Sequence, residues 1–380
     1  MHTIYSAKQA NTVDPKETYR QIAKTTVVEK KPVSQSNHDA GKNHLSQWQE
    51  VTMYNEKEIK MFDLNRQYIL MSALQKSIRW CEVNDSRYFA KELMDMGSKS
   101  ATVFNQLLTI AAEDIGLADP TLIFYVRKLY NEFEFKRKQI DIKKADAFKF
   151  PELREFVDRA VIAEAISYKS RLLAMATGAT LYDIYQNETF NKKVSVFLRR
   201  LAESIEIKDE KRALYNAIVA GNFFNCMDGI LKFLGEKSKQ RNDRLIQGWA
   251  KEYNRNSEMM VLAGCVVMLC RNLNFKHGEY VDAVDKYISI PIKKAQIPDR
   301  AYDKHTKKGR MMGRGNKYFL EVGATVKNER FPNDWKKTAK NAYYSAERKG
   351  FKTTKMLIEA IDTKYKEAQQ QAATQGIITF

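Results

Sequence analysis

The sequence predicts an all-α protein, and three observations support this prediction. Glycine and proline are scarce, with 16 and 7 residues among 380, whereas turn-rich all-β proteins need many of both. From about residue 64 onward, apolar residues recur every three or four positions, which is the period of an amphipathic helix. Alternation of apolar and polar residues, the pattern of a half-buried strand, does not rise above noise. We therefore expect a multi-helix fold with one shared core.

Residues 1–60 are predicted to form a flexible N-terminal tail. They are polar and aperiodic, with a nascent helix near residues 54–62 as the only regular feature. Such a segment buries too little apolar surface to offset the entropy lost on ordering.

A helical domain is predicted over residues 61–290. Its first apolar stripe includes Ala73, Leu74 and Ile78, and the next helices end near Gly97 and Ala111. Asp119 and Pro120 predict a helix start, because a carboxylate caps free amides and proline needs no donor in the first turn. After a charged connector, helices are expected over roughly 152–176, 190–206, 209–220, 222–235, 238–254, 257–273 and 278–288.

The chain has a formal net charge of +18, and much of it lies near the C-terminus. A basic, glycine-containing segment is expected over 291–335, followed by C-terminal helices and a tail over 336–380. A localised basic field attracts polyanions, most often nucleic acid. Two alternatives stay open, namely a solvated lysine-rich surface and a surface that docks an acidic protein partner.

Nine basic residues between 293 and 317 are the candidate DNA contacts. Four of them, at 300, 304, 307 and 308, have helical spacing, so we expect them on one side of a helix facing successive phosphates. Nonspecific DNA binding is implied, because such contacts carry no base information. The candidates are Lys293, Lys294, Arg300, Lys304, Lys307, Lys308, Arg310, Arg314 and Lys317.

Two segments carry the most specific signal. Residues 72–79 read Ser-Ala-Leu-Gln-Lys-Ser-Ile-Arg, and residues 112–120 read Ala-Glu-Asp-Ile-Gly-Leu-Ala-Asp-Pro. In this order and at this separation they resemble the C-terminal helical collar of the replication-associated recombination protein A family, which are clamp-loader-like AAA+ ATPases. The residues that carry the resemblance are Ser72, Leu74, Lys76, Ser77, Ile78, Arg79, Glu113, Asp114, Gly116, Asp119 and Pro120.

The resemblance extends more weakly to residues 165–171 and 297–315, and it breaks at Gln75 and Trp80, where the family has histidine and glycine. It implies an oligomerising scaffold in DNA replication, recombination or repair, with an AAA+ ATPase or another replisome protein as partner. With Ala73, Leu74 and Ile78 facing the core, we expect Lys76 and Arg79 to project from the opposite side. Only about seventy residues precede Ser72, so no ATPase module is expected there.

No enzyme motif is present, so we expect no catalytic residue, no cofactor and no metal. The sequence has no phosphate-binding loop, no H-E-x-x-H and no G-x-S-x-G. Neither catalysis nor metal binding is expected at Glu113, Asp114 or Asp119. The four cysteines are scattered without a C-x-x-C pair, which indicates a reducing compartment without structural zinc.

No run of eighteen apolar residues occurs, so no membrane partner is expected and the location is predicted to be cytoplasmic, bacterial or in a viral host. The C-terminal tip resembles a sliding-clamp-binding peptide, with an aromatic plug after branched apolar residues. The residues concerned are Gln375, Ile377, Ile378 and Phe380.

Overall fold

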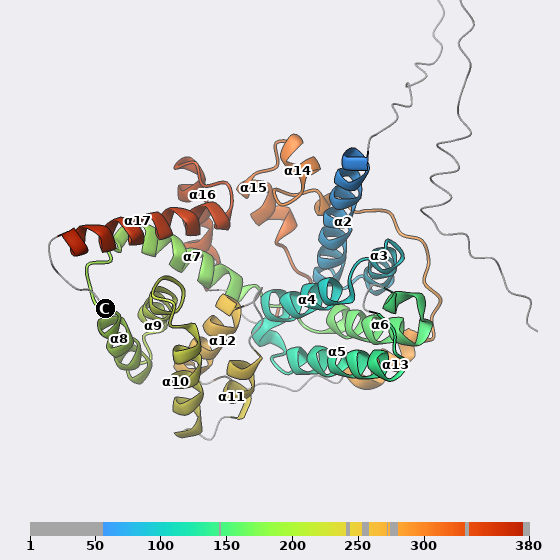
Figure 1. The fold of residues 1–380 in the computed structure, drawn as a ribbon, viewed down its shortest axis with the longest axis horizontal. Coiled ribbons are helices and arrows are strands. Elements are labelled where there is room, and N and C mark those ends of the chain that lie inside the picture. Colours follow the sequence, from blue (N-terminus) through green and yellow to red (C-terminus); the bar gives the residue numbers. More distant parts are fainter. Residues whose placement is uncertain are drawn as a thin grey trace, which may run out of the picture. The chain divides into compact units, whose positions relative to one another are not determined.

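The computed structural model describes residues 56–143, 146–240, 244–252, 258–271, 273, 280–330 and 334–374. The chain divides into two units, Met1–Asp63 and Leu64–Phe380, and the fold below is that of the second. Within the described ranges every regular element is helical, apart from one isolated β-bridge between Lys169 and Glu329 (Figure 1). The all-α prediction is confirmed. The predicted N-terminal tail lies outside the described residues up to position 55.

In chain order the helices are α2 (Glu56–Arg79), α3 (Val83–Asp95), α4 (Ser100–Ile110), α5 (Leu122–Gln139), α6 (Pro151–Ile166), α7 (Leu172–Asn187), α8 (Val194–Glu206), α9 (Glu210–Ile218), α10 (Met227–Gln240), α11 (Arg244–Lys251), α12 (Glu258–Cys270), α13 (Tyr280–Ile288), α14 (Lys307–Met311), α15 (Asn316–Tyr318), α16 (Lys336–Arg348) and α17 (Thr354–Thr374). Short π-helical turns interrupt them at Ala111–Ile115, Val219–Phe223 and Phe319–Gly323, and short 3-10 turns at Gly116–Ala118, Ala147–Lys149 and Asp299–Ala301. The longest connections between helices lie in the basic segment, before α14 and before α16.

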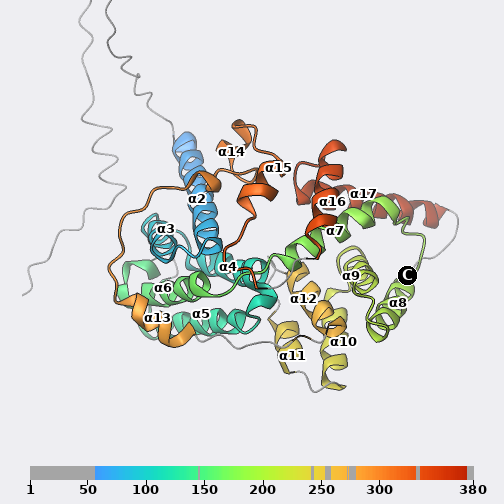
Figure 2. The ribbon, with the colours of Figure 1, turned by 180° about the vertical axis from the view of Figure 1, so that it is seen from behind.

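Two helices organise the packing. Around α6 lie α3, α4, α5 and α13, while α7 is surrounded by α9, α12, α16 and α17 (Figures 1 and 2). Helix α12 is apolar on all sides and is buried from Val261 to Cys270, as expected for a helix without a polar face. Among the described residues, no helix is long and apolar enough to cross a membrane.

Several predicted helix boundaries are wrong. The helices expected over 190–206, 222–235 and 238–254 begin instead at Val194, Met227 and Arg244. The helix expected from 152 to 176 is broken, because residues 167–171 leave the helical path between α6 and α7. There the backbone of Lys169 bonds to Asn328 and Arg330, at 3.1 Å each. Helix α5 begins at Leu122, and no side chain caps it. Asp119 Oδ1 instead accepts a 2.8 Å bond from Thr121 Oγ1, because tight turns occupy residues 111–118.

The interior of the fold holds a carboxyl group in an unusual state. Both carboxyl oxygens of Glu164, on α6, are buried without a hydrogen-bond partner among the described residues. The nearby ammonium of Lys169 donates to backbone carbonyls instead, including those of Glu164 at 2.8 Å and Ala165 at 3.1 Å. Burial raises the pKa of Glu164 well above its ordinary value, so the folded protein holds this group protonated.

Glu164→Gln should therefore change how stability depends on pH. An unfolded glutamic acid ionises near pH 4.3, whereas the folded one keeps its proton to higher pH. The unfolded state then binds fewer protons, so this group lowers the stability of the wild type as pH rises above that value. Urea unfolding is measured at pH 5 and pH 8 (roughly one unit and several units above 4.3). The free energy of unfolding of the variant, relative to that of the wild type, should be higher at pH 8 than at pH 5. Glu152→Gln, at an exposed position of the same helix, controls for loss of one carboxyl group. A constant difference between Glu164→Gln and the wild type would contradict the protonated state.

Candidate nucleic-acid interface

Segments 72–79 and 112–120, far apart in the sequence, meet at a buried carboxylate. Asp114 Oδ1 accepts bonds from Arg79 Nε at 2.8 Å and from a terminal nitrogen of Arg171 at 2.6 Å, while Oδ2 accepts from Gln75 at 2.8 Å. Burial alone raises the pKa of Asp114, but the charges of Arg79 and Arg171 outweigh it, so the pKa lies below its ordinary value. An ionised carboxylate thus joins α2, the turn at 111–115 and the start of α7.

A second buried ion pair ties α2 to the basic segment. Lys76 Nζ lies 2.8 Å from Asp303 Oδ2 and donates to Ser72 Oγ at 2.9 Å. The hydroxyl of Ser72 donates in turn to the carbonyl of Ala301 at 2.8 Å. Burial raises the pKa of Asp303, but hydrogen bonding from His305 and the charge of Lys76 bring it well below its ordinary value. The turn around residue 303 is therefore fastened to α2 by charge.

These contacts correct one expectation from the sequence. Lys76 and Arg79 do not project from the helix to solvent, since both are buried with Asp303 and Asp114 as partners. Ala73, Leu74 and Ile78 are buried as expected, so both sides of this part of α2 face the interior. Except for half-buried Glu113, the other residues of the family resemblance are also buried, namely Ser72, Ser77, Gly116, Asp119 and Pro120.

The C-terminal part of the basic segment, at residues 323–327, contacts the same helix end. Arg79 donates to the carbonyl of Gly323 at 2.5 Å, and its own carbonyl accepts from the amide of Lys327 at 2.9 Å. Trp80, where the family resemblance breaks, lies close to two cations, with Arg300 at 4.7 Å and Lys327 at 4.9 Å from a ring centroid. Sequence reasoning missed this arrangement, because nothing near residue 80 indicates a partner from residue 300 or 327.

The domain boundaries proposed at 61, 291 and 336 stay predictions.

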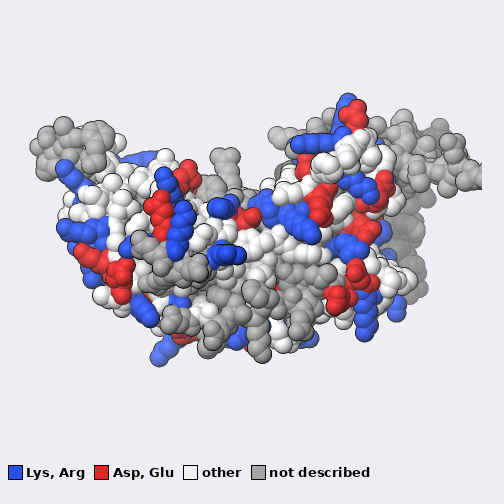
Figure 3. Space-filling model, turned by 90° about the horizontal axis from the view of Figure 1, so that it is seen from below, with Lys and Arg blue, Asp and Glu red and all other residues white. Residues whose placement is uncertain are grey.

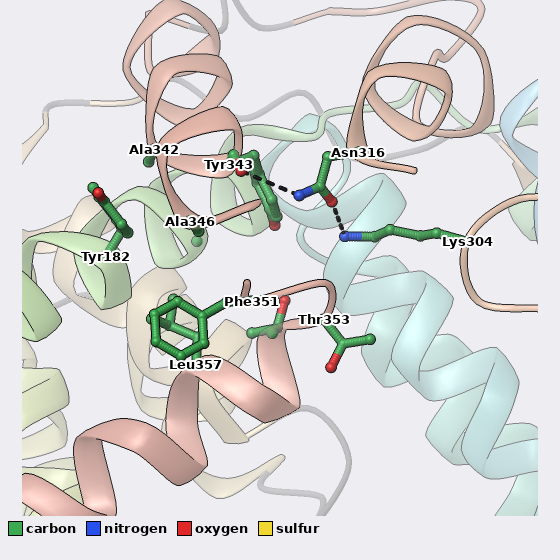
Figure 4. Close-up of a pocket in the computed structure, with 11 residues that line it drawn as sticks. Tyr182, Lys304, Asn316, Ala342, Tyr343, Ala346, Phe351, Thr353 and Leu357 are labelled. Atoms are coloured by element: carbon green, nitrogen blue, oxygen red, sulfur yellow. Dashed lines mark hydrogen bonds between the residues drawn. The ribbon is translucent and has the colours of Figure 1, made fainter. Parts of the chain in front are cut away.

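Lys304 is not a surface residue, contrary to its selection as a DNA contact. Its Nζ donates to Asn316 Oδ1 at 2.5 Å (Figure 4). It also lies 4.8 and 5.0 Å from the ring centroids of Phe319 and Tyr343. Burial lowers the pKa of Lys304 to about 8. An ammonium held among aromatic rings in the interior does not reach a phosphate on a bound nucleic acid.

The cavity beside Lys304 is too small for a ligand. Its volume is about 10 Å³, measured as the space open to the centre of a water molecule, so it can hold roughly one water molecule. The labelled side chains around it include Tyr182, Tyr343, Phe351 and Leu357 (Figure 4). Among the described residues, no group of three or more His, Cys, Asp or Glu is placed to hold a metal ion.

The predicted basic helix is also absent, because residues 299–301 form a 3-10 turn and α14 begins only at Lys307. Arg300 is half-buried and pairs with Glu82, while Arg314 pairs with Asp299 at 2.7 Å. The other candidate cations are exposed, namely Lys293, Lys294, Lys307, Lys308, Arg310 and Lys317.

Residues 307–317, which we call the basic loop, concentrate this charge. The loop reads Lys-Lys-Gly-Arg-Met-Met-Gly-Arg-Gly-Asn-Lys and contains no acidic residue. Figure 3 shows a contrasting face of the molecule, where the basic side chains of the described residues lie among acidic ones.

The basic loop is held in place by contacts with the residues that precede it. Thr306 Oγ1 accepts from the amide of Gly309 at 3.0 Å and so caps α14. A Cβ atom on Gly309 would lie 1.9 Å from the carbonyl oxygen of Asp303, so only glycine allows α14 to pack this closely on the preceding turn. Arg314 donates to the carbonyls of Asp299 and Tyr302 at 2.8 and 2.9 Å. The loop presents its cations from a fixed backbone.

The clamp-binding tail proposed at Gln375, Ile377, Ile378 and Phe380 lies outside the described residues and stays a prediction. The DNA contacts proposed at the exposed lysines and arginines likewise stay predictions.

Comparison with known proteins gives one distant similarity. No family model matches the chain, and no solved structure matches it. The chain is 33% identical over 122 residues to "Replication-associated recombination protein A" of Bacillus subtilis (strain 168). The match covers 32% of this chain and 26% of that relative, so the chain spans about a quarter of the length of the curated relative it matches. This similarity supports a distant relation to the replication-associated recombination protein A family.

Proposed function

We propose that this chain is an accessory scaffold protein in DNA replication, recombination or repair, and that it binds DNA through the basic loop. The observation that carries the proposal is the loop itself, which exposes Lys307, Lys308, Arg310 and Lys317 without an acidic neighbour in the loop. The name of the distantly related Bacillus subtilis protein supports the replication and recombination context.

The mechanism proposed is positioning by charge. Lysine and arginine side chains neutralise phosphates and release condensed counterions, which gives affinity without sequence specificity. Because the loop backbone is held by Thr306, Gly309 and Arg314, little further backbone ordering is needed when DNA binds. The buried pair of Lys76 with Asp303 serves this function indirectly, since it fastens the turn that precedes the loop to α2.

We further propose that the chain does not hydrolyse ATP itself. The sequence has no phosphate-binding loop, so an associated AAA+ protein would supply this activity if the assembly needs it. The oligomeric scaffold role implied by the family resemblance belongs to the same proposal.

Binding to duplex DNA should weaken steeply as salt rises from about 50 to 200 mM. Fluorescence anisotropy measures this dependence as the slope of log K against log salt. Replacing Lys307, Lys308, Arg310 and Lys317 together by glutamine should make the slope shallower by about 0.9 for each phosphate that the variant no longer neutralises.

The matched control changes the net charge equally at exposed lysines elsewhere, with Lys138, Lys211, Lys232 and Lys239 replaced by glutamine. This control should keep the wild-type slope. If the wild type does not bind DNA at low salt, or if both quadruple variants have the same salt slope, the basic loop is not a DNA interface. The first of these results would favour an acidic protein as its partner.

A further inference from the structure

The tip of the basic loop exposes two adjacent methionines. Met311, the last residue of α14, is 79% exposed, and Met312, which follows it, is 48% exposed. A single exposed apolar side chain is common on protein surfaces and needs no explanation. Two neighbouring methionines, in a loop whose other residues are basic or small, form a small apolar patch within a positively charged surface.

This exposure is built into the loop. Gly313 adopts a φ of +71°, a conformation that glycine reaches without strain, and the chain turns back there. On either side the backbone is fastened, by the Thr306 cap before the methionines and by Arg314 after them. The methionines therefore stand outside the core because the fixed backbone holds them there.

The surroundings of the methionines indicate the chemistry of their partner. Lys307, Lys308, Arg310 and Lys317 are all exposed cations of the same loop. The ammonium of Lys308 lies 4.1 Å from the ring centroid of Tyr302, which holds its charge close to the loop. A partner that matches both features has a dense row of negative charges and an apolar interior that an inserted side chain can reach. DNA has both, in its phosphates and its stacked bases.

We propose that Met311 and Met312 form a wedge that inserts between adjacent bases of DNA held by the basic loop. The inference rests on the proposed function and adds how the DNA is deformed. Inserting an apolar side chain unstacks a base step, and contacts made to the bent duplex offset the cost of unstacking. Methionine suits this role because its unbranched, polarisable side chain adapts to an irregular gap.

A duplex with 2-aminopurine in its T–A steps tests the wedge, since these steps unstack most easily and the analogue brightens when unstacked. Fluorescence and anisotropy are followed in one titration of the full chain at low salt. At saturation the wild type should raise the fluorescence, and Met311→Ala/Met312→Ala should lose most of that rise. The double variant should bind several-fold more weakly with an unchanged salt slope. Met356→Ala, which shortens an exposed methionine on α17, should behave as the wild type does.

Two results would overturn the wedge while leaving DNA binding in place. One is a wild-type protein that binds the duplex without brightening the analogue. The other is a double-alanine variant that binds and brightens it as the wild type does. Failure of the wild type to bind any DNA would overturn the wedge together with the proposed function.

Discussion

Asp114→Asn should lower the free energy of unfolding by about 3–5 kcal/mol, the range found when one partner of a buried ion pair is removed. The substitution keeps the shape of the side chain but leaves the guanidinium groups of Arg79 and Arg171 facing a neutral amide in the interior. Among the described residues, half-buried Glu113 is the other carboxylate that pairs with both. Urea unfolding followed by far-ultraviolet circular dichroism measures the change.

The control is the same substitution in a surface pair. Asp146 lies 2.8 Å from Lys149 with 43% of its side chain exposed, and Asp146→Asn should barely change stability because solvent screens the pair. A loss of stability in Asp114→Asn as small as that in Asp146→Asn would show that the Asp114 cluster does not hold the fold together.

The Asp114 effect should also depend on pH. Since the pKa of Asp114 is lowered in the folded state, its contribution is present above the unfolded value of about 3.9 and is lost as pH falls through the folded value. The stability difference between wild type and Asp114→Asn should therefore shrink in acid.

Asp303→Asn should destabilise the protein to a similar extent, by about 3–5 kcal/mol, because it leaves the buried ammonium of Lys76 without its carboxylate. Asparagine retains an oxygen that can accept the 2.9 Å bond from the amide of His305, so the turn keeps that contact. The expected loss arises from the uncompensated charge.

A double-mutant cycle isolates this charge effect. Lys76→Met removes the ammonium and fills the space with an apolar side chain, so Lys76→Met/Asp303→Asn should be more stable than the sum of the single changes predicts. Urea unfolding of the four proteins gives the coupling energy. Simple additivity of the two single effects would mean that the pair contributes no interaction of its own.

Helical periodicity was sufficient to predict the fold class and much of the core. Ala73, Leu74 and Ile78 share a stripe in the sequence and are buried in the structure, and the apolar run of α12 is buried from Val261 to Cys270. These predictions hold because side chains three or four residues apart lie on one face of a helix, whatever the rest of the chain does.

Periodicity failed for the polar residues on the same helix. The spacing places Lys76 and Arg79 away from the apolar stripe, which usually means solvent. Here that side of α2 meets Asp114, Asp303 and the carbonyl of Gly323, and Gly323 lies 244 positions further along the chain than Arg79. The local sequence does not predict which distant carboxylate will contact a given face of a helix.

For the basic residues, too, the sequence predicts where charge is concentrated but not which side chains are exposed. The composition of the basic segment and its place between residues 293 and 317 could be determined from the sequence by itself, because charge is a property of each residue. Only the tertiary structure decided which cations face solvent. Lys304 and Lys308 are four residues apart, yet one lies among aromatic rings and the other is exposed, since the close packing of Gly309 on residue 303 turns the chain between them.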